Sequence, residues 1–137
     1  MMEFMKPLAV AAAGLKAQTS RMRVIAENIA NAEVAPVKPG DEPYQRKYVS
    51  FASMVDRSEN ITSVRLDKIG SFGNEFRLVS NPGHIAADEN GMVKMPKVDM
   101  FMEMADMRET IRSYEANLQS MKRARSMISM AIDMMKG

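Results

Sequence analysis

Apolar residues recur at alternating spacings of four and three near both ends of this chain, and this pattern constrains the fold more than any other feature. In the last third the spacing selects Met100, Met104, Met107, Ile111, Tyr114, Leu118, Met121, Arg125, Ile128, Ile132 and Met135. Near the start it selects Leu8, Ala11, Leu15, Gln18, Met22, Ile25, Ile29 and Ala32. Only Arg125 and Gln18 interrupt the stripes with polar side chains. A stripe of this kind needs a partner helix, so each pattern predicts a helix with a coiled-coil-like seam.

The two stripes and the residues between them predict an α+β chain in three parts. An N-terminal helix is expected within residues 1–35, beginning at Pro7 in its first turn and ending before Pro36. A small unit of strands and loops should occupy residues 36–96, with candidate strands at 44–51, 61–69 and 72–79. The C-terminal helix is expected within residues 97–137, after Pro96.

An antiparallel hairpin is the simplest way for the two helices to cover each other's seams. If the polar breaks Gln18 and Arg125 lie opposite one another, Leu8 falls near Met135 and Ala32 falls near Ile111. The start of the first helix and the end of the second then share one end of the hairpin.

Both helices carry more apolar surface at that shared end than a single seam requires. Residues 8–15 contain no polar side chain, and apolar residues occupy most of the helix circumference over residues 124–135. A helix that is hydrophobic all round is normally buried on all sides, so we expect this end to be ordered only among neighbouring chains. The abundant methionines either fill a helical core or adapt one surface to several different neighbours.

The composition excludes several classes of function. The net charge is +2 with no strongly basic segment, which argues against nucleic-acid binding. Cysteine is absent and His84 is the sole histidine, expected in a solvated loop, so no metal site, cofactor or catalytic centre is predicted. The acidic residues of the last helix are expected on a solvated face. Residues 8–15 also fit the apolar core of a secretory signal, but the helical pattern continues past Ala17 through Ile29, with Gln18 as its one polar position.

Two segments carry a resemblance to a known family. The run from Gly14 to Ala32, GLKAQTSRMRVIAENIANA, resembles the N-terminal signature of bacterial flagellar rod and hook proteins, whose core corresponds to the final Asn-Ile-Ala-Asn-Ala. The run from Val98 to Asn117, VDMFMEMADMRETIRSYEAN, is similar to their C-terminal signature. The small middle unit and the segment DENGMVKMP before Val98 favour a proximal-rod member of that family.

The resemblance implies a structural, non-enzymatic subunit of the flagellar basal-body rod, which crosses the periplasm and transmits torque. Its partners would be copies of itself, other rod subunits and the type III export apparatus, with no nucleic acid or small-molecule substrate and no cleaved signal peptide. The expected assembly residues are Leu8, Leu15, Asn28, Ile29, Asn31, Ala32, Met104, Ile111, Tyr114, Glu115, Asn117, Leu118, Met127, Met130 and Met134.

Two alternatives remain at this stage. In the first, Asn31 simply ends its helix and Tyr114 simply fills a core position, so neither residue acts in assembly. In the second, the chain as a whole is a soluble helical-hairpin adaptor, or a secreted protein, that binds one partner helix and forms no polymer.

Overall fold

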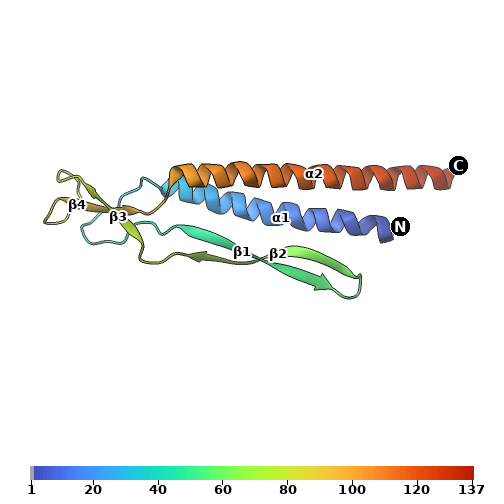
Figure 1. Ribbon diagram of the computed structural model, residues 1–137, viewed down its shortest axis with the longest axis horizontal. Coiled ribbons are helices and arrows are strands. Elements are labelled where there is room, and N and C mark those ends of the chain that lie inside the picture. The colour runs from blue at the N-terminus through green and yellow to red at the C-terminus, as the bar shows by residue number, and fades with distance from the viewer. Residues whose placement is uncertain (1) are drawn as a thin grey trace. The chain divides into compact units, whose positions relative to one another are not determined.

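The structure, a computed structural model, describes residues 2–137, and its elements confirm the predicted α+β class. Their order is α1 (Met2–Asn31), β1 (Lys47–Asp56), β2 (Ile61–Ser71), β3 (Phe76–Ser80), β4 (Met92–Pro96) and α2 (Met100–Lys136), as Figure 1 shows. The chain forms two compact units. The first unit contains residues 2–22, 50–68 and 108–137, and the second unit contains residues 23–49 and 69–107.

Helix α1 is longer than the sequence predicted. It begins at Met2, so Pro7 lies inside the helix and not in its first turn. Because proline has no backbone N–H, it removes one hydrogen bond from this part of the helix. At the other end Ala32 N–H donates to the Ile29 carbonyl over 3.3 Å, and the chain then leaves the helix ahead of Pro36.

Helix α2 starts at a side-chain cap. The Asp99 carboxylate accepts hydrogen bonds from the backbone N–H groups of Phe101 at 3.0 Å and Met102 at 3.3 Å. The Asp99 carbonyl accepts the N–H of Glu103 at 3.0 Å, which is the first bond of the helical ladder. An aspartate in this position satisfies N–H groups that have no partner within the helix, and it favours the helix dipole.

The buried stripe of α2 is rotated by one residue from the predicted seam. Glu103, Thr110 and Ala124 are buried, whereas the predicted positions Met104 and Ile111 are 49% and 42% exposed. The predicted positions Met107, Tyr114, Met121 and Ile128 are half-buried and border the buried stripe. The prediction was therefore wrong for the exposed positions Met104, Ile111, Arg125, Ile132 and Met135, because it weighed hydrophobicity, whereas the buried positions carry small or hydrogen-bonding side chains.

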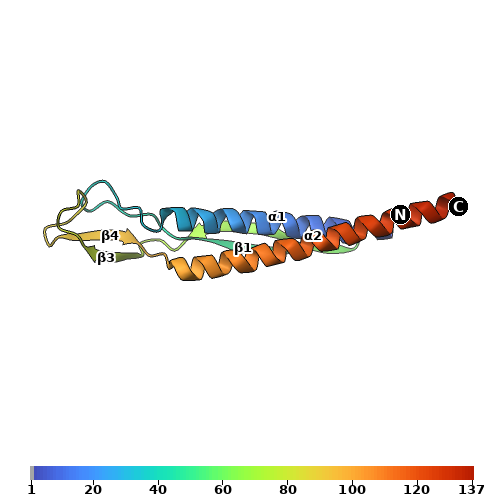
Figure 2. The same cartoon turned by 90° about the horizontal axis from the view of Figure 1, so that it is seen from above.

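In the first unit the two helix segments run antiparallel at close range. A Cβ atom on Gly14 would lie 2.8 Å from Nδ2 of Asn117, and Arg21 Nη2 lies 3.9 Å from the Glu109 carboxylate. Figure 2 shows the same arrangement from above. This register contradicts the predicted one, in which Gln18 would face Arg125. At this position glycine leaves room for the Asn117 side chain of α2 to lie against α1.

Strands β1 and β2 form a two-stranded ribbon joined by a tight turn, and residues 50–68 of this ribbon belong to the first unit. The Asp56 carboxylate accepts bonds from Ser58 N–H at 3.0 Å and Ser58 Oγ at 2.6 Å, which holds the pKa of Asp56 below its ordinary value. Asn60 completes the turn with a φ of 53°. An asparagine tolerates this left-handed conformation better than most residues do.

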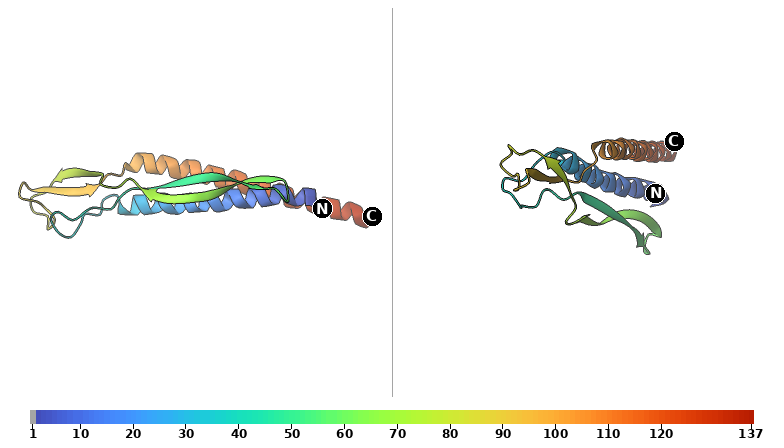
Figure 3. Two further views of the ribbon diagram at one scale, coloured as in Figure 1. Left: turned by 90° about the horizontal axis from the view of Figure 1, so that it is seen from below. Right: turned by 60° about the vertical axis from the view of Figure 1, so that its left-hand side comes forward.

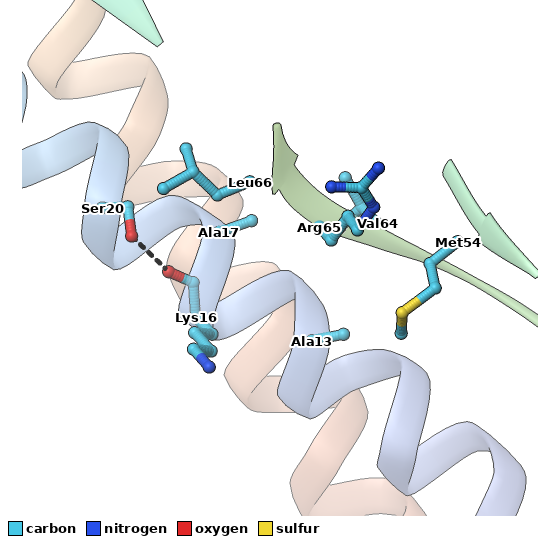
Figure 4. A pocket seen from close by; sticks show the side chains of 8 residues that line it. All are labelled: Ala13, Lys16, Ala17, Ser20, Met54, Val64, Arg65 and Leu66. Atoms are coloured by element: carbon cyan, nitrogen blue, oxygen red, sulfur yellow. Dashed lines mark hydrogen bonds between the residues drawn. The ribbon is translucent and has the colours of Figure 1, made fainter. Parts of the chain in front are cut away.

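A hollow of about 400 Å³ separates α1 from this ribbon within the first unit. Figure 4 shows Ala13 and Ala17 on the helix side, and Met54, Val64 and Leu66 on the ribbon side. Small residues on the helix therefore leave the ribbon without close support over this stretch.

The second unit contains a sheet of strands β3 and β4, visible in Figure 3. The strands are antiparallel, with Phe76 opposite Pro96 and Val79 opposite Val93. The sequence predicted a strand at 72–79, but β3 begins only after the turn at Asn74, where φ is 62°. Strand β4 was not predicted.

Candidate assembly surfaces and a buried polar cluster

A cluster of polar side chains lies at the centre of the second unit. We call it the polar cluster, and its members are Glu27, Asn28, Tyr44, Arg46, Lys47 and Glu103. They come from α1, from the segment that leads into β1, and from α2. Polar groups buried in this way are stable only when each has a hydrogen-bond partner.

Asn28 occupies the middle of the polar cluster. Its Nδ2 donates to the Lys47 carbonyl at 2.9 Å and to Glu103 Oε2 at 3.4 Å. Its Oδ1 accepts from the Lys47 N–H at 2.9 Å and from the Tyr44 hydroxyl at 2.6 Å. The Asn28 amide thus bonds both backbone groups of Lys47, as a neighbouring strand would do, and it joins α1 to the start of β1.

Glu103 is the buried charged residue of the polar cluster. It is 1% exposed, and its Oε1 accepts a charge-assisted hydrogen bond from Arg46 Nε. The Arg46 guanidinium also lies 5.2 Å from the centre of the Phe72 ring. A buried carboxylate without such a partner would be strongly destabilising. The prediction of a solvated acidic face on α2 is therefore wrong for Glu103.

The environment of Tyr44 raises the pKa of its hydroxyl above the ordinary value of 10.0. Burial is the main cause, and the neighbouring carboxylates of Glu27 and Glu103 act in the same direction. The positive charge of Arg46 opposes them. Tyr44 consequently stays neutral at physiological pH and serves as the hydrogen-bond donor that Asn28 Oδ1 requires.

A second ion pair of the second unit reinforces the link between α1 and the strands. Arg77 of β3 contacts both carboxylate oxygens of Glu33 at 2.9 Å, and its Nε donates to the Pro96 carbonyl at 3.1 Å. A single guanidinium nitrogen, Nη2, makes both contacts with Glu33, while Nε holds the Pro96 carbonyl. The turn just after α1 is thus attached to the β3–β4 sheet.

His84 lies in the loop between β3 and β4 and is half-buried, not solvated as predicted. Its Nδ1 accepts a hydrogen bond from the Ala86 N–H at 2.9 Å, so the ring stabilises the loop. Among the described residues, no group of three or more histidine, aspartate or glutamate side chains is placed to hold a metal ion. Over residues 2–137, neither helix combines the length and the apolar character needed to cross a bilayer.

Comparisons with known proteins match the sequence over most of the chain. A family described as flagellar basal body rod FlgEFG protein C-terminal matches residues 89–134, which include β4 and nearly all of α2. The flagellar basal-body rod protein FlgC of Agrobacterium fabrum is 45% identical over 127 residues, covering 93% of this chain and 91% of that protein. The chain belongs to the FlgC family of flagellar basal-body rod proteins.

More distant FlgC proteins extend across almost the same length. The FlgC protein of Salmonella typhimurium is 34% identical and covers 87% of this chain and 88% of its own. That of Bacillus subtilis is 33% identical, covering 94% of this chain and 96% of its own. The similarity therefore includes the middle segment as well as both helices.

The residues predicted to act in assembly of this FlgC-family chain fall into two groups by exposure. The exposed group contains Met104, Ile111, Glu115, Met127, Met130 and Met134. The buried or half-buried group contains Leu8, Leu15, Asn28, Ile29, Asn31, Ala32, Tyr114, Asn117 and Leu118. Three side chains of the second group make contacts inside the chain. Asn28 belongs to the polar cluster, Asn31 donates to the Glu27 carbonyl at 2.8 Å, and Asn117 lies against Gly14.

Sequence reasoning missed Glu103, Arg46 and Tyr44 as members of the site. Each is charged or polar and lies outside the apolar stripes, so hydrophobic periodicity gave no signal for it. Two indications were present: the family resemblance, which includes Glu103 and the segment 43–47, and a heptad of small or hydrogen-bonding residues at Glu103, Thr110, Asn117 and Ala124. A stripe of that composition is easily overlooked beside a neighbouring stripe of methionine and isoleucine.

Proposed function

We propose that this chain is a structural subunit of the flagellar basal-body rod, specifically of its proximal part. The observation that carries the proposal is the 45% identity to a basal-body rod protein over 93% of the chain. Its role is mechanical rather than catalytic. The exposed apolar residues of α2 support a role in contacts between chains.

In this proposal the two helices form an antiparallel, coiled-coil-like hairpin that makes up the inner part of the rod. The inner part comprises residues 1–35 and 97–137, and the strand-and-loop segment 36–96 lies outside it. The antiparallel contacts within the first unit, such as Gly14 against Asn117, support this arrangement.

The exposed group of predicted assembly residues would contact neighbouring chains directly. The buried and half-buried group would act indirectly, because it fixes the helices that present the exposed residues. Asn28 is the best example, since its amide is fully engaged with Lys47, Tyr44 and Glu103 inside the chain.

Torque transmission requires that subunits neither slide past one another nor deform. Interdigitated side chains along long helices resist sliding. Within the second unit, the charge-assisted bond between Arg46 and Glu103 and the bonds of Asn28 resist deformation of the chain itself.

The partners in this proposal are copies of the same chain, other rod subunits and the flagellar type III export apparatus. Their location is the basal body, where the rod crosses the periplasm. Export would proceed without cleavage of a signal peptide.

Deletion of the encoding gene and complementation test the proposal. The deletion strain should be non-motile, with basal bodies that lack a completed rod and hook, and the wild-type gene should restore both. Complementation with Met134→Asp should fail or be weak, whereas Thr62→Asp, an exposed change on the ribbon, should restore motility. A motile deletion strain with complete hooks would overturn the proposal, and purified chain that forms only a finite one-to-one complex with a partner would favour the adaptor.

A further inference from the structure

A second hollow in the first unit lies at the open edge of the contact between α1 and α2. It measures about 390 Å³ and its lining residues include Glu3, Phe4 and Pro7 of α1 and Arg123, Ala124 and Met127 of α2. Phe4 is 38% exposed and Met127 is 54% exposed. The lining is mostly apolar, and its polar members are Ser120, Arg123 and Glu3, of which Glu3 also pairs with Lys6 at 3.1 Å. The hollow therefore continues the interface between the two helix segments.

The last two turns of α2 have the complementary character. Met130, Met134 and Met135 are 58%, 82% and 77% exposed. The exposed charged residues Asp133 and Lys136 accompany them. Figures 1 and 2 show these turns extending beyond the first turn of α1. Flexible methionine side chains suit insertion into a hollow of irregular shape.

The hollow and the methionine-rich end cannot meet within one chain. Met127 lines the hollow and Met134 lies seven residues further along the same helix, which places them roughly 10 Å apart along its axis. Any α2 end that enters the hollow must therefore come from another chain. A second copy of the chain offers the right chemistry, because its Asp133 can face Arg123 and its Lys136 can face Glu3.

We propose that the methionine-rich end of α2 in one copy docks into the 390 Å³ hollow of a second copy. The inference rests on the proposed rod function and assigns one specific contact within it. The two surfaces differ, so the contact is heterologous, and its repetition gives either a closed ring or an open helical array. Two copies with parallel helices would be displaced along the helix axis by roughly ten residues, or about 15 Å.

Cross-linking between two single-cysteine proteins tests the contact, since the natural chain has no cysteine. Purified full-length Phe4→Cys, labelled with ¹⁵N, is mixed with unlabelled Met134→Cys under mild oxidation. Mass spectrometry then counts the mixed disulfide dimers. We expect a yield several-fold above that of a control mixture in which Thr62→Cys, an exposed position on the ribbon, replaces Phe4→Cys. Equal yields in the two mixtures would overturn the inference.

Charge reversal then separates a specific contact from loose hydrophobic association. Adding Arg123→Glu to the Phe4→Cys protein should lower the yield about threefold, as expected for losing one exposed charge pair. Adding Asp133→Arg to the Met134→Cys protein as well should restore it. Absence of restoration would contradict the predicted pairing. If both tests fail while the wild-type gene still supports a rod in cells, the docking contact is wrong and the rod function stands.

Discussion

Asn28 and Asn31 are one turn apart on α1, yet their side chains have different surroundings. The Asn28 amide is buried and makes hydrogen bonds to the backbone of Lys47 and to the side chains of Tyr44 and Glu103. The Asn31 amide is half-buried and donates back to the Glu27 carbonyl of its own helix. Asn28 therefore links separate parts of the fold, whereas Asn31, in the same short motif, stabilises only the end of its own helix.

Replacing these two asparagines should separate the two roles. We expect Asn28→Ala to lower the free energy of unfolding by about 2 to 4 kcal/mol, because the Lys47 backbone groups and the Tyr44 hydroxyl lose their partner. Asn31→Ala is the matched control and should cost about 1 kcal/mol or less. Urea denaturation followed by circular dichroism measures both values. Equal losses would contradict the central position of Asn28 in the polar cluster.

The raised pKa of Tyr44 gives the polar cluster a distinct dependence on pH. The folded chain holds the hydroxyl proton more tightly than the unfolded chain, in which the pKa is near 10.0. The contribution of the protonated Tyr44 hydroxyl to the free energy of unfolding is therefore complete below pH 10. This contribution is lost as pH rises through the higher pKa of the folded state. Tyr44→Phe should cost about 1 kcal/mol of stability at pH 8, by removing the bond to Asn28.

The stability difference between wild type and Tyr44→Phe should therefore shrink as pH rises above 10. The difference cancels the titration of lysine residues, which both proteins share. Urea midpoints at pH 8, 10 and 11 measure it. A difference that stays constant or grows over this range would show that the Tyr44 proton is not held by the fold.

At the scale of secondary-structure elements, hydrophobic spacing predicted both helices and the first two strands but not how α2 is oriented. The seam of α2 is rotated because burial follows Glu103 and Thr110. The partners of Glu103, Arg46 and Asn28, lie far away in the sequence and cannot be read from local spacing. Strand β4 is short and ends at Pro96, so it carried too few alternating residues to be predicted. Its Val93 nevertheless lies opposite Val79 in a regular antiparallel ladder.

The register of the two helices in the first unit depends on Gly14. Because a Cβ atom there would lie 2.8 Å from Asn117 Nδ2, we expect Gly14→Val to force the helices apart and cost about 1 to 3 kcal/mol. Adding Asn117→Ala should recover part of that loss. Ala12→Val is the matched control on an exposed position of α1, where only helix propensity changes, by about 0.5 kcal/mol. Thermal unfolding of these variants beside the wild type checks the prediction, and a Gly14→Val chain as stable as Ala12→Val would contradict it.

At the scale of the whole chain, apolar exposure is uneven along α2. Ala124 is 5% exposed, whereas Met134 is 82% exposed. Stability within a protein follows such differences, because turns with few apolar contacts open at a low free-energy cost. The free chain should therefore contain two long helices of unequal stability along their length, with the least stable turns at the methionine-rich end.

Hydrogen exchange measured by mass spectrometry tests this gradient. In the free chain, amides of residues 128–136 should exchange much faster than those of residues 103–124, and the difference should follow from the exposed Met130, Met134 and Met135. In copies joined by a disulfide between the Phe4→Cys and Met134→Cys proteins, residues 128–136 should become protected, because docking covers those turns. Thr62→Cys chains provide the control without that contact. Full protection of residues 128–136 in the free chain would mean that these turns need no neighbour to be ordered, and that their methionines are exposed for another reason.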